Sequence, residues 1–437
     1  MTTRPTAALG PAELAAAGER MHARLVELFP IPRSITGNGV RSTLARLAQE
    51  IPLAVHEVPT GEPALDWTVP REWNLREAWL RGPGGEEILH SRDSSLHVLG
   101  YSVPVDRKLT LDELQAHLHS LPDRPDWIPY RTSYYREDWG LCLPHRQRAA
   151  LQPGDYQVRI DSTLQPGRLT YGELFLPGQS RDEILLSCHI CHPSLANDNL
   201  SGVTVATELA RRLAETPRRL GLRLLFIPGT IGSLVWLARN ESATGRIAGG
   251  LVMANLGDAG GFHYKKSRRG DAAIDRAVPV AIAGLGESVE IEDFAPFGYD
   301  ERQYCSPGFD LPVGSLTRTP WGRYPEYHSS ADDCDFVRPT QLAGSLAAYI
   351  EVVQILDGNA RYRNLSPKGE PQLGRRGLYK PVGGGEAGRR ELALLWVLNL
   401  SDGDHDLLAI AERSGLPFAA VREAADALIE AELLAPI

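Results

Sequence analysis

The chain has 437 residues, of which 46 are Lys or Arg and 55 are Asp or Glu, so its formal net charge is −9. This balance excludes a broadly basic nucleic-acid-binding protein but leaves room for a local basic patch. Five cysteines in a chain of this length argue against a disulfide framework and for a reducing compartment. No apolar run approaches the roughly 18 residues of a transmembrane helix, and the first residues lack the order of a signal peptide. We therefore expect a cytoplasmic protein of about two to three domains, with no membrane partner.

Helical patterns open the chain. Segment 11–29 spaces its apolar residues as an amphipathic helix does, and Pro30 and Pro32 follow it. Residues 41–50 predict a second short helix. Between residues 53 and 165, Trp, Tyr and Pro become frequent, and short alternating runs predict strands separated by turns. Because helical segments precede this β-rich stretch, we interpret it as a domain inserted into the main one.

Strands and helices alternate through residues 166–362. Strands are expected at 182–188, 222–228 and 249–257, and helices at 200–215, 230–240 and 341–356. Such alternation is typical of a parallel sheet covered by helices. We expect residues 1–52 and 166–362 to form one α/β domain.

Residues 366–437 are expected to form a third unit. Its first part belongs to a linker rich in Pro, Gly and Arg (365–388), and helices follow this linker. Two helices joined by a Gly-containing turn, with a third before them, resemble a winged-helix module. Residues 402–437 contain eight acidic residues and two arginines, whereas a recognition helix needs cations to contact phosphates. The sequence therefore predicts a packing or dimerisation module, with a homo-oligomer as one outcome, and no nucleic-acid partner.

The densest group of potential metal ligands follows the strand at 182–188. His189, His192 and Asp198 lie within ten residues of one another, where functional groups gather in open α/β sheets. Zinc accepts both imidazole nitrogen and carboxylate oxygen, so the segment predicts a metal site.

Cys188 and Cys191 also form a C-x-x-C motif in this segment. Redox chemistry of the thioredoxin type needs that motif to open a helix, but Pro193 and a loop follow it. We interpret both cysteines as small buried residues.

Further ligands would have to come from distant loops. Asp258 follows the strand at 249–257, and Glu326 and His328 lie in a polar loop that contains proline. The first cluster offers too few ligands to close a catalytic site, so these later residues are candidates for the remaining ligands.

The order of these residues resembles that of the co-catalytic zinc aminopeptidases. More closely, the chain is similar to a bacterial family with an aminopeptidase-like domain, a β-rich insertion and a C-terminal winged helix. The segments that carry the resemblance span nearly the whole chain and include IPRSITGNGVR, IPYRTSYY, HICHPSLANDNLSG, DERQYCSPGF, LTRTPWGRYPEYHSSADD and LNLSDGDHDLLAIAERSGL. The resemblance implies an α/β fold with a mixed sheet flanked by helices, an inserted β-rich domain and a winged-helix-like domain.

The resemblance also implies a site for one or two zinc ions. In it, His189 matches the strand-end His ligand and Asp198 the carboxylate that bridges two zincs. Asp258 matches a later acidic ligand, and His328 matches the final His ligand. His192 has no plain counterpart, so it is a ligand, a substrate contact or a residue that supports a ligand.

The chain departs from the family pattern at position 229. The aminopeptidases carry two consecutive Glu residues, a general base and a ligand, where this chain has Gly229 and Thr230. A general base contributes about 10²–10⁴-fold to the rate, although bound zinc alone lowers the pKa of water. Glu301 and Glu326 are candidate substitutes for the base, and Asp300 matches a residue that orients groups in the site. Loss of the second Glu allows a single-metal site.

Basic and aromatic residues near the expected ligands are candidate substrate contacts. Lys266 and Arg268 belong to KKSRRG, which is either a solvated loop or an anion contact. Arg318 and Arg323 flank TPWG, just before the late His, and Tyr327 could line a pocket.

Taken together, these features predict a zinc-dependent hydrolase of the aminopeptidase type. Its substrate would be a small peptide or an aminoacyl amide, cleaved by metal-activated water. The alternative is a catalytically impaired relative that binds a ligand or partner through the same site, and Gly229 is its main support. A regulator that binds DNA through the winged helix is disfavoured by the acidic C-terminal segment.

Overall fold

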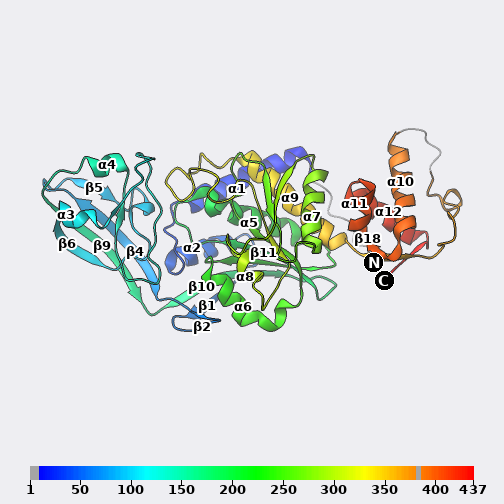
Figure 1. Ribbon diagram of the computed structural model, residues 1–437, viewed down its shortest axis with the longest axis horizontal. Coiled ribbons are helices and arrows are strands. Elements are labelled where there is room, and N and C mark those ends of the chain that lie inside the picture. The colour runs from blue at the N-terminus through cyan, green and yellow to red at the C-terminus, as the bar shows by residue number, and fades with distance from the viewer. Residues whose placement is uncertain (1–8, 380–384) are drawn as a thin grey trace.

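The computed structural model describes residues 9–379 and 385–437 and arranges them as three units in a row (Figure 1). An α/β unit lies in the centre, the β-rich insertion on one side and the C-terminal helical unit on the other. Part of the predicted linker, residues 380–384, lies outside the described residues. No described helix is both long enough and apolar enough to cross a membrane.

The central unit contains α1 (Pro11–Leu28), α2 (Asn38–Leu47), β1 (Ala54–Pro59), β2 (Pro63–Ala64), β3 (Trp67–Thr68), β10 (Arg168–Leu176), β11 (Glu183–His189), η2 (Ala196–Ser201), α5 (Gly202–Leu213), β12 (Gly221–Ile227), α6 (Ile231–Thr244), β13 (Ile247–Met253), β14 (Phe262–Lys265), α7 (Ala273–Gly284), β15 (Val289–Glu292), α8 (Glu301–Tyr304), β16 (Val313–Thr317) and α9 (Pro339–Gly358). The insertion contains β4 (Glu72–Arg81), β5 (Glu87–His90), η1 (Ser95–His97), β6 (Val105–Thr110), α3 (Leu111–Gln115), β7 (Leu118–His119), β8 (Leu141–Cys142), α4 (His145–Ala149) and β9 (Asp155–Gln165). The C-terminal unit contains β17 (Arg361–Asn364), η3 (Gly374–Arg376), α10 (Gly385–Leu400), β18 (Asp402–Asp406), α11 (Leu407–Ser414), α12 (Phe418–Glu430) and β19 (Leu434–Pro436).

One eight-stranded mixed sheet forms the centre of the molecule, in the order β1-β10-β12-β11-β13-β16-β14-β15. Strands β12, β11, β13 and β16 are parallel, and β1 and β10 are antiparallel to their neighbours. Strand β14 is antiparallel to β16 and parallel to β15. The predicted mixed sheet flanked by helices is confirmed. Residues 54–59 were expected in the insertion, but β1 pairs with β10, so the inserted sheet begins only at β4.

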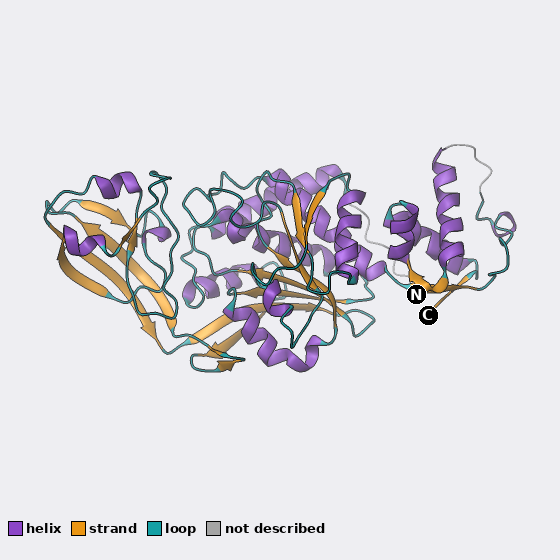
Figure 2. Ribbon diagram, in the orientation of Figure 1, coloured by secondary structure: helices purple, strands orange, loops and turns teal. Residues whose placement is uncertain are grey.

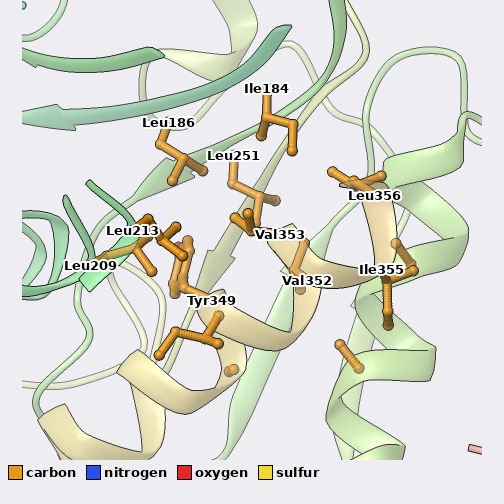
Figure 3. Packing of buried hydrophobic residues seen from close by; sticks show 14 of the residues in the cluster. Ile184, Leu186, Leu209, Leu213, Leu251, Tyr349, Val352, Val353, Ile355 and Leu356 are labelled. Atoms are coloured by element: carbon orange, nitrogen blue, oxygen red, sulfur yellow. The ribbon is translucent and has the colours of Figure 1, made fainter. Parts of the chain in front are cut away.

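Both faces of the central strands are buried, as a sheet covered by helices requires (Figure 2). Along β11, Ile184 and Leu186 point to one face, where they pack with Leu251 and with Val353 of α9 (Figure 3). Leu185 points to the other face and belongs to the cluster that includes α6. This alternation fixes which side chains reach the site at the ends of the strands.

Helix α1 is anchored by a buried arginine. Arg24, only 3% exposed, donates from Nε to Glu50 Oε1 (3.0 Å) and from Nη1 to Thr204 Oγ1 (2.9 Å). The hydrogen bonds from Arg24 hold the pKa of Glu50 at about 2, against its ordinary 4.5, although burial opposes this.

We expect Glu50→Gln to lower the free energy of unfolding by about 1–2 kcal/mol at pH 7. Because the pKa of Glu50 is lowered on folding, its contribution is complete above pH 4.5 and is lost as the pH falls towards 2. Denaturation of the unaltered protein and of Glu50→Gln, at pH 7 and again near pH 2, measures this difference. Glu137→Gln, at the exposed pair with Arg71, is the matched control and should change little. An equal effect of Glu50→Gln at both pH values would contradict the expectation.

The insertion is built on a four-stranded antiparallel sheet in the order β5-β4-β9-β6. Its loop at 126–139 returns to the α/β unit. There the Ile128 N–H donates to Ser330 Oγ (2.9 Å), and the Tyr130 N–H donates to the carbonyl of His328 (2.8 Å). The insertion is therefore attached next to a predicted metal ligand.

The C-terminal unit packs against the α/β unit. Arg276 of α7 pairs with Glu412 (2.6 Å) and Asp406 (3.2 Å). Arg422 of α12 donates to the carbonyl of Gly358 (2.8 Å). The predicted winged-helix-like architecture is confirmed, and α12 faces the end of α9.

Candidate metal centre and active site

The ends of the parallel strands bring the main candidate residues together. His189 is the last residue of β11, and Asp198 lies in η2, the irregular turn that precedes α5. His328 lies in the loop between β16 and α9. This edge of the sheet is where open α/β folds hold their functional groups.

Asp198 lies between two histidines. Its Oδ1 is 2.7 Å from His189 Nε2, and its Oδ2 is 3.0 Å from His328 Nε2. The carboxylate is fully buried. Burial opposes ionisation, but His189 and His328, which contact its two oxygens, hold the pKa of Asp198 well below its ordinary value. The chain thus keeps a buried anion with a ring nitrogen at each oxygen.

His192 completes the group. Ligand atoms of His189, His192 and Asp198 all lie within 4.8 Å of one another. The His192 ring centroid is 4.9 Å from that of His189 and 5.2 Å from that of His328. Burial lowers the pKa of His192 to about 3, so its ring is neutral, which is the form that binds metals. Imidazole nitrogens and a carboxylate are the donors that zinc prefers.

Neighbouring side chains fix the turn that carries Asp198. Asp332 accepts the backbone N–H groups of Asn197 (2.6 Å) and Asp198 (2.9 Å). Asn199 Nδ2 donates to the carbonyls of Met253 (2.9 Å) and His189 (3.2 Å). The turn is thereby tied to the ends of both β11 and β13. Sequence reasoning did not single out Asp332 or Asn199.

Asp258, a predicted ligand, has other partners. Its Oδ1 accepts from Thr319 Oγ1 (2.5 Å) and the Gly260 N–H (2.8 Å), and its Oδ2 accepts from Asn197 Nδ2 (3.0 Å). The structure therefore does not bring Asp258 into the ligand group. The carboxylate instead ties together the loops that follow β13 and β16, because its strand ends at Met253 and the chain turns before Asp258.

Gly229 lies against both the metal group and a buried carboxyl. A Cβ at this position would be 3.1 Å from His189 Cβ and 3.3 Å from Asp300 Oδ2. Asp300 is buried and accepts a hydrogen bond from Ser233 Oγ (3.0 Å). Burial raises the pKa of Asp300 to about 6. The space beside position 229 thus contains a carboxyl group supplied from another part of the chain.

Neither of the other two candidate bases has a side-chain hydrogen bond or ion pair with the metal group among the described residues. Glu301 is fully buried and pairs with Lys265, in a cavity separate from the metal group. Glu326 is half-buried, and its backbone carbonyl accepts from Ser329 Oγ (2.8 Å).

Tyrosine rings wall the metal group. Tyr327 stacks on His328 with 3.9 Å between ring centroids, and Tyr299 stacks on His189 at 5.9 Å. Tyr130, from the insertion, meets the edges of His192 (5.1 Å) and His328 (5.0 Å). Tyr327 was predicted. Tyr299 and Tyr130 were missed, although IPYRTSYY was noted as a family segment.

Two of the predicted anion contacts form surface ion pairs. Lys266 Nζ is 3.0 Å from Asp293 Oδ1, and Arg268 Nη1 is 2.7 Å from Asp310 Oδ1. Their neighbour Lys265 faces a cavity instead. Alternate residues of a strand point to opposite sides, and β14 ends at Lys265.

The other two predicted anion contacts differ in environment. Arg318 is buried and donates to Ser345 Oγ (3.0 Å) and the carbonyl of Gly260 (2.8 Å), which is a structural role. Arg323 lies at a cavity beside the metal group, where it pairs with Glu290 (2.7 Å).

Comparison with protein-family models places most of the chain in one family. Residues 22–359 match the model described as "Domain of unknown function (DUF4910)", and residues 360–436 match a winged helix-turn-helix model. The chain belongs to the DUF4910 family.

Relatives of this DUF4910 protein agree with the architecture. A protein of Clostridium acetobutylicum named "Putative polysaccharide biosynthesis protein with aminopeptidase-like domain" is 47% identical over 418 residues, covering 95% of this chain and 96% of the relative. A crystal structure of a "putative peptidase" from the same species superposes with a TM-score of 0.92 at 45% identity, covering 98% of each chain.

More distant structures share the fold. A zinc aminopeptidase from Bacillus subtilis superposes with a TM-score of 0.56 at 12% identity, covering 77% of this chain and 94% of the other. A peptidase M28 precursor from Shewanella amazonensis gives 0.56 at 14% identity, covering 79% and 95%. The aminopeptidase-like fold predicted from the sequence is confirmed.

Proposed function

We propose that the chain is a metal-dependent hydrolase of the aminopeptidase type that cleaves a peptide or amide bond in a small substrate. The observation that carries the proposal is Asp198, buried with a His Nε2 at each carboxylate oxygen. The fold shared with zinc aminopeptidases supports it. The amide bond would be held near the strand ends, between the α/β unit and the loop of the insertion.

Zinc suits this donor set. His189, His192, Asp198 and His328 are the residues that would hold one or two zinc ions. Bound zinc would polarise the substrate carbonyl and lower the pKa of a water molecule. The neutral state of His192 and the ionised state of Asp198 leave both groups ready to act as ligands.

The chain's own residues would supply the rest of the chemistry. We assign proton acceptance to Asp300, the buried carboxyl beside Gly229, because a pKa of about 6 lies near the working pH. Tyr130 and Tyr327 would exclude water and narrow the entrance, which limits the substrate to a small molecule.

The substrate class draws on the Clostridium relative, whose name refers to polysaccharide biosynthesis. We infer that this chain acts on an amide in a small precursor, in the cytoplasm, where its five free cysteines stay reduced. The winged helix would serve as a packing module without a nucleic-acid or membrane partner. Its helix α12 already faces the α/β unit, and a homo-oligomer through the opposite side fits this role.

The second candidate is a binding protein without catalysis. Gly229 favours it, because this chain has no side chain at the position where the aminopeptidases carry their general base. In this case the histidine group would hold a metal or a ligand, and no bound molecule would be hydrolysed.

Elemental analysis of protein purified without chelator tests the proposal. We expect about one zinc per chain, and hydrolysis of an aminoacyl p-nitroanilide that is lost with a chelator and restored with zinc. Metal without hydrolysis of any amide in a substrate panel would favour the binding protein. Absence of metal even after zinc is supplied would reject the metal-dependent hydrolase and favour a protein that binds a ligand other than a metal.

A further inference from the structure

The cavity lined by Lys265, Glu301 and Arg323 has a volume of about 290 Å³ and lies beside the metal group. Its floor consists of strands β14, β15 and β16, and segments 297–301 and 320–323 line its sides. Tyr299 belongs to both sites, because its side chain lines this cavity while its ring stacks on His189. A molecule in the cavity would therefore reach towards the metal group.

The strand register makes the cavity floor polar. His263 is paired with Thr317 and Lys265 with Ser315 across β14 and β16, so these four side chains share one face. All four line the cavity. The alternate residue Tyr264 points the other way, into the hydrophobic core.

The buried polar atoms at this cavity include Glu301 Oε2, Ser315 Oγ and His263 Nε2, in residues that are at most 5% exposed. Of these, His263 Nε2 lies 3.3 Å from the carboxylate of Glu292, whereas Glu301 Oε2 and Ser315 Oγ have no such neighbour among the described residues. Buried polar atoms are normally paired, so the unpaired Glu301 Oε2 and Ser315 Oγ indicate groups that a ligand would satisfy.

The cations at the cavity are already paired with carboxylates. Lys265 Nζ pairs with Glu301 and also donates to the carbonyls of Phe297 (2.8 Å) and Ala295 (3.3 Å), which uses its three protons. Arg323 is engaged with Glu290. Both cations that line the cavity are therefore paired with carboxylates, which leaves no free cation for a phosphate or carboxylate among the described residues that line it.

The remaining polar atoms suit hydroxyl groups. Glu301 Oε2 accepts hydrogen bonds, and Ser315 Oγ both donates and accepts. Burial, helped by Arg323, lowers the pKa of His263, so its neutral ring can donate or accept according to its tautomer. A hydroxyl likewise donates and accepts, and it carries no charge.

Aromatic rings line the side of the cavity. Trp321 and Phe297 meet edge to face with 5.0 Å between centroids, and Phe297 is 62% exposed. An aromatic face packs well against the C–H face of a sugar ring, while the sugar hydroxyls project sideways to polar atoms. An apolar side chain would leave Glu301 Oε2 and Ser315 Oγ unpaired.

We propose that this cavity binds a neutral polyhydroxylated group, namely one sugar unit of the substrate. The sugar stacks on Trp321, its hydroxyls bond to Glu301 and Ser315, and its amide substituent extends past Tyr299 to the metal group. This last step rests on the proposed function and defines the substrate as a sugar that carries an amide.

Binding of N-acetyl-D-glucosamine to the full chain as purified tests the proposal, by saturation-transfer NMR titration. We expect saturable binding that Ser315→Ala weakens about fivefold to tenfold and Trp321→Ala about tenfold or more. Matched controls are Ser401→Ala, whose buried hydroxyl also lacks a partner among the described residues, and Trp67→Ala, an exposed tryptophan. Both controls should bind like the unaltered protein.

Three results would overturn the sugar site. They are no saturable binding of the sugar, equal binding in the Ser315→Ala and Trp321→Ala variants, and L-leucinamide or inorganic phosphate binding there in its place. The readout is binding, so it is separate from hydrolysis. Sugar binding by a protein that holds no zinc would retain this cavity's assignment and reject the hydrolase. Amide hydrolysis without sugar binding would support the hydrolase and reject the sugar site.

Discussion

Asp198→Asn is expected to abolish metal binding and to reduce amide hydrolysis at least about 100-fold. Both oxygens of Asp198 face histidine nitrogens, so an amide in its place removes the anion and turns a donor towards one ring. Elemental analysis and steady-state hydrolysis on the same preparation measure both effects. A circular dichroism spectrum and a melting curve establish that the variant is folded.

Asp258→Asn is the matched control for this experiment. The substitution is the same, and the residue is equally buried, but its oxygens are used by Thr319, Gly260 and Asn197. We expect this variant to lose some stability and to keep its metal. Metal loss in Asp258→Asn with retention in Asp198→Asn would show that the family ligand pattern holds and that our ligand group is wrong.

The contrast between these two aspartates shows how far a sequence can define a site. The order of His189, Asp198, Asp258 and His328 pointed to one edge of the sheet, and three of the four meet there. The direction of the Asp258 carboxylate depends on how the chain turns after Met253. Local sequence does not determine that turn, because partners from the loop after β16 select it.

Local patterns predicted the helices and core strands well and the long-range pairings poorly. The helix expected at 11–29 runs from Pro11 to Leu28, and the strand expected at 182–188 is β11. Strand β1 was assigned to the insertion because its partner β10 lies beyond that insertion in sequence. Alternation reveals a strand but not its neighbour.

Residues from distant segments were the main omissions at the site. Tyr130 reaches the histidines only because the insertion folds back onto the loop around His328. Lys266, and not Lys265, was predicted as a substrate contact, because the positive charge of KKSRRG does not indicate which lysine faces inward. The strand register decides that question.

Gly229→Glu alone is expected to lower stability by about 1–3 kcal/mol and to give no gain in hydrolysis. Its Cβ would come within 3.1 Å of His189 Cβ and 3.3 Å of Asp300 Oδ2, so the neighbours must shift. The new carboxylate would also lie near a buried carboxyl, and two such groups raise each other's pKa. Gly229→Ala measures the steric part of this cost without the added charge.

The double variant Gly229→Glu, Asp300→Ala separates the two roles. If Asp300 accepts the proton, Asp300→Ala loses about 10²-fold in hydrolysis and keeps its metal, because a general base contributes about this much. Adding Glu at 229 then restores one carboxylate to a space that Asp300 no longer fills, and we expect most of the activity to return. The effects of the two changes would be strongly non-additive, as they are for groups that share one site. Full activity in Asp300→Ala would exclude Asp300 as the proton acceptor, and a large gain in Gly229→Glu alone would identify the missing glutamate as the defect of a weakened enzyme.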